Sequence, residues 1–230
     1  MKSETTFQKS LGWVVTILTP LMVLMVAVRL LISPVFTWVE YRLPGFPDDP
    51  YGFTLEDRLQ WSRPSITYLV NGEGIDYLAA LTFDNGDPIY NAEELSHMAD
   101  VKAVVTGMRV ALAVVAVALL LVVLLAKRQG WQRHLLLAFR RGGWGVVGLI
   151  AAILLFVALS FNQLFTWFHQ IFFASGTWQF YTSDTLIRLF PMRFWQDAFI
   201  DMGVLSLLFG VLLILFCRPR RRDMASESEG

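Results

Sequence analysis

The sequence predicts an all-α membrane protein in which four spanning helices form one bundle. The 230 residues are 55% hydrophobic and only 17% charged, whereas charged residues make up about 25% of an ordinary soluble domain. Four separate segments are apolar over the roughly 20 residues that a helix needs to cross a bilayer. The long connection between the first two segments carries helix and turn signals. We therefore expect a single membrane domain with a large, partly helical outer loop between spans 1 and 2.

The first span resembles a secretory signal in outline, because Lys2 and Lys9 precede an apolar run. That run is too long for a signal, and no convincing small-residue cleavage site follows it. We therefore expect the segment to stay in the membrane as an anchor. The four predicted spans cover residues 11–33, 103–126, 143–166 and 198–217.

The distribution of lysine and arginine predicts the orientation, because positive residues are retained on the cytoplasmic side. They gather between the second and third spans and behind the fourth, whereas the connection over residues 34–102 is acidic. We expect both termini in the cytoplasm and the 34–102 loop on the outer side. The basic residues are Lys127, Arg128, Arg133, Arg140, Arg141, Arg218, Arg220, Arg221 and Arg222.

The outer loop contains short predicted elements. Thr54 with Asp57 three residues later forms a capping-box pattern, which opens a helix expected to lie on the membrane surface. Pro64 should kink or end the first half of that helix. Residues 79–83 lie between two turn signals and could form a short strand. The polar tail over residues 224–230 is expected to be disordered.

Composition and motifs exclude several kinds of site. Lysine plus arginine equal aspartate plus glutamate at 19 each, which gives no basic surface for nucleic acid. The single cysteine, Cys217, cannot form a disulfide framework or a cysteine-rich metal site. Neither the H-E-x-x-H pattern nor the G-x-S-x-G pattern occurs. We expect no metal and no cofactor, and a catalyst of this kind needs a substrate that brings its own nucleophile.

His97 is the first candidate catalytic residue. Asn91 with Glu94 is an N-cap signature, so a helix should begin there and run directly into the second span. At 100° per residue, Glu93 and Asp100 fall in the same stripe as His97, where either carboxylate could orient the ring. The alternative is an exposed histidine on a solvated, charged helical turn.

His169 is the second candidate. Spacings of four and three place Asn162, Thr166 and His169 on one face at the end of the third span. Polar groups in a span face the bundle interior or a wet cavity, so this face should point inward. The alternative is an amphipathic member of an aromatic belt at the membrane interface. That belt would also contain Trp167, Trp178, Phe180 and Tyr181.

Both histidines should reach the same outer interfacial layer. Carboxylates around one ring and an apolar, aromatic setting around the other would separate their proton affinities, which suits an acid and a base that work together. A different reading is a bis-histidine haem carrier, since two imidazoles at one depth can ligate iron. A third is a non-catalytic lipid-binding or assembly partner in which the histidines are incidental.

Charged residues near the outer boundary have a simpler interpretation. Arg29 and Arg109 lie just inside the outer ends of the first and second spans. They are expected to contact lipid head groups, either by snorkelling to phosphates or by binding a lipid phosphate or ester in the site. Asp197 and Asp201, one turn apart at the outer end of the fourth span, could pair with Arg193 or Arg188, and we expect that pairing to be structural.

Several stretches together resemble a bacterial four-span membrane family. The run 93–102, the phenylalanine-rich stretch 165–173, Trp178 and residues 184–191 carry the resemblance. The family contains the lipoprotein intramolecular transacylase. The resemblance implies an acyltransferase of the bacterial cell membrane that moves the sn-2 acyl chain of a diacylglyceryl lipoprotein to the α-amine of its N-terminal cysteine, leaving a lyso-form lipoprotein. Membrane lipid and the lipoprotein N-terminus are the implied partners, and the functional histidine pair corresponds to His97 and His169.

Overall fold

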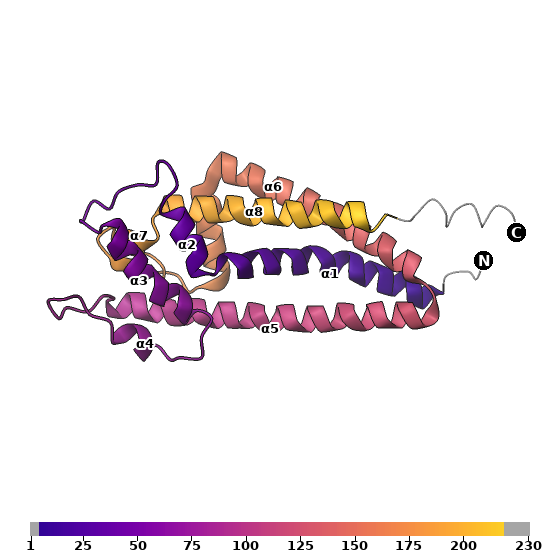
Figure 1. Ribbon diagram of the computed structural model, residues 1–230, viewed down its shortest axis with the longest axis horizontal. Coiled ribbons are helices and arrows are strands. Elements are labelled where there is room, and N and C mark those ends of the chain that lie inside the picture. Colours follow the sequence, from indigo (N-terminus) through magenta and orange to yellow (C-terminus); the bar gives the residue numbers. More distant parts are fainter. Residues whose placement is uncertain (1–4, 219–230) are drawn as a thin grey trace, which may run out of the picture. The chain divides into compact units, whose positions relative to one another are not determined.

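The computed structural model describes residues 5–218, so our expectations for Lys2, for Arg220 to Arg222 and for the tail over 224–230 lie outside the described residues. Within residues 5–218 the chain forms eight helices, and its only β-type pairing is the isolated bridge between Thr82 and Pro88. Four of the helices are long and apolar enough to cross a membrane. This confirms the all-α fold with four spanning helices. The long helices are α1 (Thr6–Leu31), α5 (Ala92–Gln129), α6 (Gln132–Phe172) and α8 (Met192–Phe216) (Figure 1).

Helix α5 begins well before the predicted span because its first turn is capped. The side chain of Asn91 accepts a hydrogen bond from the backbone amide of Glu94 at 2.9 Å, and the Glu94 carboxylate accepts one from the amide of Asn91 at 2.8 Å. These bonds satisfy amides that a bare helix end leaves without partners. The predicted N-cap is therefore confirmed, and His97 lies on an uninterrupted helix that continues into the second span.

Helix α6 is interrupted at Ser160, where φ is −161° and ψ is 66°. The predicted span over 143–166 lies within this helix, but the interruption inside it was not predicted. Serine is neither proline nor glycine, so the sequence contains no breaker that announces the interruption. Residues 161–172 consequently form a separate helical segment, and this segment carries His169.

The chain forms two compact units. Within the described residues, the first contains residues 5–27, 111–154 and 202–218. Helices α6 and α8 approach closely in this unit, because a Cβ added at Gly143 would lie 2.8 Å from the backbone oxygen of Gly210. Small residues commonly permit such contacts between membrane helices.

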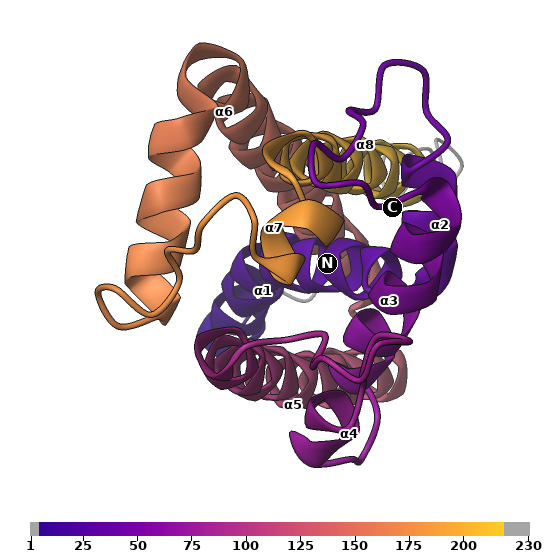
Figure 2. The ribbon, with the colours of Figure 1, turned by 90° about the vertical axis from the view of Figure 1, so that its left-hand side faces the viewer.

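The second unit contains residues 28–110 and 155–201. Its short helices are α2 (Pro34–Glu40), α3 (Leu55–Tyr68), α4 (Asp76–Ala79) and α7 (Thr185–Leu189). Figures 1 and 2 show α2, α3, α4 and α7 gathered near the N-terminal end of α5. Its core is formed by buried apolar residues that include Tyr41, Tyr68, Leu78, Ile89, Leu189, Phe190 and Phe194.

The outer loop differs from two predictions. The capping box of Thr54 and Asp57 is present, but α3 then runs unbroken through Pro64 to Tyr68. Packing against α2, α4 and α7 holds this helix together where local sequence favours a kink. The strand predicted over residues 79–83 is also wrong. Its first residue ends α4, and a tight turn at Gly86, where φ is +87°, limits the pairing to the single bridge.

Candidate functional site

Two histidines from different helices meet in the second unit. His97 of α5 is 9% exposed and His169 of α6 is 7% exposed. Their ring centroids lie 6.3 Å apart and the ring planes differ by 20°. At this separation the rings are neighbours without being bonded to each other. A reacting group beside both rings would be within reach of a nitrogen from each, as paired acid–base catalysis requires.

One nitrogen of His169 has a fixed role. Its Nδ1 lies 2.8 Å from the backbone oxygen of Phe165, one helical turn earlier. A carbonyl oxygen can only accept a hydrogen bond, so Nδ1 carries the proton in this contact. In the neutral ring, Nε2 then has a free lone pair. The backbone of α6 therefore prepares His169 to accept a proton through Nε2.

Aromatic side chains surround the pair. The ring centroids of Phe165 and Trp178 lie 4.1 Å and 4.8 Å from that of His169. Those of Phe173 and Phe180 lie 4.9 Å and 5.4 Å from that of His97. The indole nitrogen of Trp178 is buried and has no hydrogen-bond partner within the described chain. The site is thus mostly apolar, with one unused N–H donor beside His169.

Glu94 holds the helix that carries His97. Its side chain is 1% exposed, and besides capping α5 it accepts a hydrogen bond from the backbone amide of Leu186 at 2.7 Å. The hydroxyl of Thr185 donates to the backbone oxygen of Ile89 at 2.6 Å. These two bonds join the beginning of α7 to the beginning of α5. Glu94 therefore fixes the turn that presents His97.

A cavity of about 390 Å³ borders the same aromatic wall. Phe165, Phe190 and Trp195 are among its apolar lining residues, and Asp48 and Arg58 are among the charged ones. Because Phe165 contacts His169 as well, this cavity and the histidine pair share a wall. The cavity thus combines apolar surface with a few polar groups, as ligand-binding pockets commonly do.

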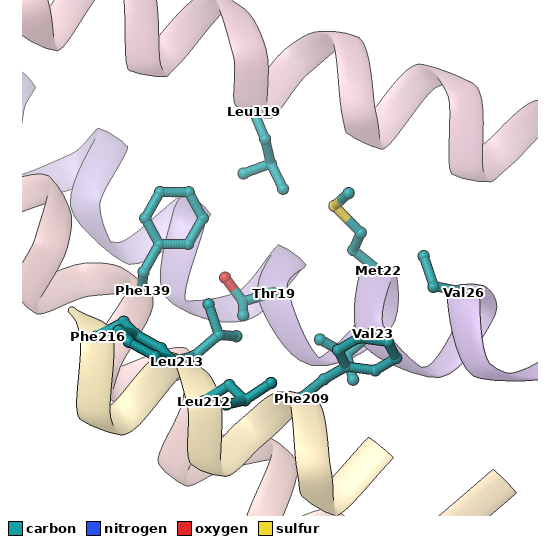
Figure 3. Close-up of a pocket in the computed structure, with 10 residues that line it drawn as sticks. All are labelled: Thr19, Met22, Val23, Val26, Leu119, Phe139, Phe209, Leu212, Leu213 and Phe216. Atoms are coloured by element: carbon teal, nitrogen blue, oxygen red, sulfur yellow. The ribbon is translucent and has the colours of Figure 1, made fainter. Parts of the chain in front are cut away.

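A slightly larger cavity, of about 410 Å³, lies wholly within the first unit. Figure 3 shows Thr19 among its otherwise apolar lining residues, which include Met22, Leu119 and Phe209. The Thr19 hydroxyl donates to the backbone oxygen of Val15 at 2.7 Å. That hydroxyl is the one polar side-chain group among the lining residues and no acid or base accompanies it, so this cavity is not a candidate active site.

A family model described as "Lipoprotein intramolecular transacylase Lit" matches residues 13–195. This chain belongs to the Lit family. A relative from Aquifex aeolicus (strain VF5), described only as an uncharacterized protein, is 28% identical over 213 residues, which are 90% of this chain and 93% of the relative. This member of the Lit family has four helices that are long and apolar enough to cross a membrane.

Solved structures share the fold of this Lit-family protein. The structure of the membrane-integral lipoprotein intramolecular transacylase Lit from Bacillus cereus has a TM-score of 0.71 and 15% identity, covering 96% of this chain and 97% of the other. Two further structures of that protein, each with a histidine replaced, have TM-scores of 0.70 and 0.65 at 16% identity. Each of these covers 96% of this chain and 95% of the other. At these identities the likeness concerns the fold.

The carboxylates predicted to orient His97 in this Lit-family protein do not contact it. Glu93 and Asp100 are exposed, and Nδ1 of His97 is buried without a partner in the described chain. The helical period placed these residues in one stripe, but the buried face of α5 carries Glu94 and His97 instead. Both imidazoles are therefore buried among aromatic rings, and the predicted contrast between their surroundings was wrong.

The polar residues predicted to accompany His169 lie outside the site. Asn162 is exposed and Thr166 is half-buried, and neither side chain forms a hydrogen bond within residues 5–218. Trp178 packs against His169 instead, a contact that neither its place in the predicted aromatic belt nor its part in the family resemblance indicated. The aromatic character of the stretch was visible in the sequence, but its contact with His169 depends on a loop that returns to α6.

The charged residues at the outer boundary have partners within the protein. Arg109 donates to the backbone oxygen of Val70 at 3.1 Å, and Arg29 donates to that of Ile32 at 3.2 Å. Their predicted contacts with lipid head groups stay predictions. The predicted pairing of Arg193 with Asp197 is present, whereas Arg188 pairs with Asp49 at 2.9 Å. Within residues 5–218, no cluster of three or more His, Cys, Asp or Glu side chains is suited to a metal ion.

Proposed function

We propose that this protein moves the sn-2 acyl chain of a diacylglyceryl lipoprotein to the α-amine of its N-terminal cysteine and so produces a lyso-form lipoprotein. The observation that carries the proposal is the pair of buried imidazoles 6.3 Å apart in an aromatic pocket. Membership of the Lit family supports the substrate class. The reaction needs no nucleophile from the enzyme, because the substrate amine attacks the substrate ester.

The two histidines would divide the proton transfers. Nε2 of His169, with its lone pair free, accepts a proton from the amine as nitrogen attacks the ester carbonyl. The bond between that carbonyl and the glyceryl oxygen then breaks, and the proton taken up by His169 is passed to the departing oxygen through the neighbouring imidazole of His97. The amine loses one proton and the glyceryl oxygen gains one, so both imidazoles begin and end the reaction neutral. Each transfer contributes about 10²- to 10⁴-fold to the rate.

The aromatic pocket supports the step between these transfers. Attack on an ester creates a negatively charged tetrahedral oxygen, and hydrogen-bond donors in a dry site stabilise such an oxygen strongly. The Nε1–H group of Trp178 is the unused donor beside His169. We assign it to this oxygen. The apolar rings around the pair exclude water, which would otherwise hydrolyse the ester in competition with the amine.

The expected location agrees with this chemistry. The positive-inside pattern predicts that both termini lie in the cytoplasm and that the 34–102 loop lies on the outer side of the cell membrane. The histidine pair belongs to the unit that contains this loop. Lipid esters and the N-termini of lipoproteins meet at that membrane surface. Holding the amine and the ester of one molecule together also adds a large proximity effect.

Mass spectrometry of lipoprotein N-terminal peptides tests the proposal. Cells that express this protein should contain lyso-form peptides with an acylated amine, and cells that express His97→Ala or His169→Ala should contain only diacyl forms. Gln170→Ala is the matched control, because Gln170 is exposed next to His169. An unchanged peptide pattern despite normal membrane accumulation would refute the proposed reaction. A Soret absorption band in the purified protein would instead support the haem alternative.

A further inference from the structure

Glu40 is a buried acid without a hydrogen-bond donor. It is the last residue of α2 and is 0% exposed. Within the described chain, neither of its carboxyl oxygens receives a hydrogen bond. An ionised carboxylate in such a place is very costly, because burial removes its water and nothing replaces that water. The arrangement therefore requires an explanation.

The groups around Glu40 make the ionised form still less favourable. Asp197 and Asp201 of α8 both lie near enough to repel a charge on Glu40. The nearby cation of α8, Arg193, already pairs with Asp197. Outside α8, the ionisable groups near Glu40 include Tyr41, which follows it in the chain, with Tyr90 and with Arg58 of α3 around Tyr41. The guanidinium carbon of Arg58 lies 6.0 Å from the centroid of the Tyr41 ring.

A protonated Glu40 resolves the problem. A carboxylic acid carries an O–H donor, which a carboxylate lacks, and the neighbouring Asp197 carboxylate is an acceptor. Burial, followed by the hydrogen bond and the charge of Asp197, raises the pKa of Glu40 to about 8. Arg193 balances the negative charge that remains on Asp197. The three side chains then carry a compatible set of donors and acceptors.

We propose that Glu40 is a neutral carboxylic acid at neutral pH, that it donates a hydrogen bond to Asp197, and that this bond makes Glu40 a positioning residue for the histidine pair. The positioning role rests on the proposed acyl transfer, whereas the protonation state does not. Glu40 touches neither histidine. It acts through the contact between α2 and α8.

A short series of ring contacts connects α8 to the site. Next to the Glu40–Asp197 pair, Phe36 of α2 packs edge-on against Phe194 of α8, with ring centroids 5.3 Å apart. The ring centroid of the adjacent Trp195 lies 6.1 Å from that of Phe165, and the centroid of Phe165 lies 4.1 Å from that of His169. The carbonyl that fixes the His169 proton also belongs to Phe165. A change in how α8 packs on α2 is therefore transmitted to the proposed base.

Ionisation of Glu40 should loosen this contact. As pH rises through about 8, the shared proton is lost and two adjacent carboxylates repel each other. If only the protonated form is fully active, activity falls about tenfold for each pH unit above that value. Glu40→Gln keeps a neutral donor of similar shape, so this variant should keep its activity at neutral pH and lose the alkaline decline that Glu40 causes.

Infrared spectroscopy tests the protonation state directly. The wild-type protein should show a protonated carboxyl band at neutral pH that disappears as pH rises through about 8 and is missing from Glu40→Gln. The control Glu56→Gln, at an exposed position in the first turn of α3, should retain the band. A wild-type protein without this band at neutral pH overturns the proposal, whether or not the protein transfers acyl groups.

Activity against pH then tests the positioning role. The wild type and Glu56→Gln should decline together at alkaline pH, while Glu40→Gln declines later. Identical pH–activity profiles for all three proteins, in a preparation that forms lyso-form product, refute the positioning role of Glu40 but do not contradict the proposed reaction. A wild type that shows the infrared band but forms no product under any condition refutes the proposed reaction and still supports a protonated Glu40 paired with Asp197.

Discussion

The clearest test of how the site is held together is Glu94→Ala. This substitution removes the acceptor for two backbone amides, those of Asn91 and Leu186. The Leu186 amide is buried and donates to the Glu94 carboxylate, so the substitution leaves this amide without that acceptor, which costs about 1–3 kcal/mol. Loss of the reciprocal cap at the start of α5 adds about 1 kcal/mol. The structure thus predicts a destabilisation of about 2–4 kcal/mol.

Thermal unfolding in detergent measures this effect. A destabilisation of 1 kcal/mol lowers Tm by about 2–4 °C in a chain of this size, so the fall should be about 4–16 °C. The matched control is Glu93→Ala. Glu93 is the exposed neighbour on the same helical turn, and its substitution should change stability by no more than about 0.5 kcal/mol. Activity should fall in Glu94→Ala even well below its Tm, because His97 lies on the turn that Glu94 anchors. Equal melting temperatures for the two variants would refute the inferred link between α5 and α7.

Two further substitutions test other parts of the structure. Trp178→Phe keeps an aromatic ring beside His169 but removes the buried N–H group, so kcat should fall about 10²-fold or more with little change in KM. Trp167→Phe, at a half-exposed position of α6, the helix that carries His169, should leave kcat unchanged. A similar loss of kcat in both variants would exclude the oxyanion role of Trp178. Gly143→Ala should destabilise the first unit by about 1–3 kcal/mol, because its Cβ meets the backbone of Gly210 at 2.8 Å. Gly148→Ala, where a Cβ meets nothing within 4 Å, should not lower Tm, and the pair of melting curves decides the matter.

Local patterns in the sequence predicted the features that local interactions determine. Hydropathy located all four spans, and the Asn91–Glu94 signature predicted the true beginning of α5. The same helical period indicated that Glu93 and Asp100 share a stripe with His97, but a period does not say which face is buried. Which face of α5 is buried depends on α7 and on the loop that contains Phe180, because these pack against the face that carries Glu94 and His97.

Long-range contacts were beyond the reach of the sequence. The bond between Glu94 and Leu186 joins residues 92 positions apart, so the capping pattern showed only the local half of Glu94's role. Glu40 had the pattern of an ordinary loop acid, and only the packing of α2 against other helices, among them α3 and α8, buries it. The interruption at Ser160 had no sequence signal either, although it separates the segment that carries His169 from the rest of α6.

The interruption at Ser160 has a consequence for how a fatty substrate arrives. Non-helical backbone exposes peptide groups that hydrocarbon cannot satisfy, so Ser160 must lie where water, lipid head groups or protein can reach it. Because Ser160 is exposed, we infer that it lies at the margin of the hydrocarbon layer and that residues 161–172 begin there. Their exposed side chains, among them Trp167, Ile171 and Phe172, are suited to contact lipid tails. Under the proposed function, an acylated protein enters laterally from the surrounding leaflet along these apolar side chains, and its acyl chains stay out of water.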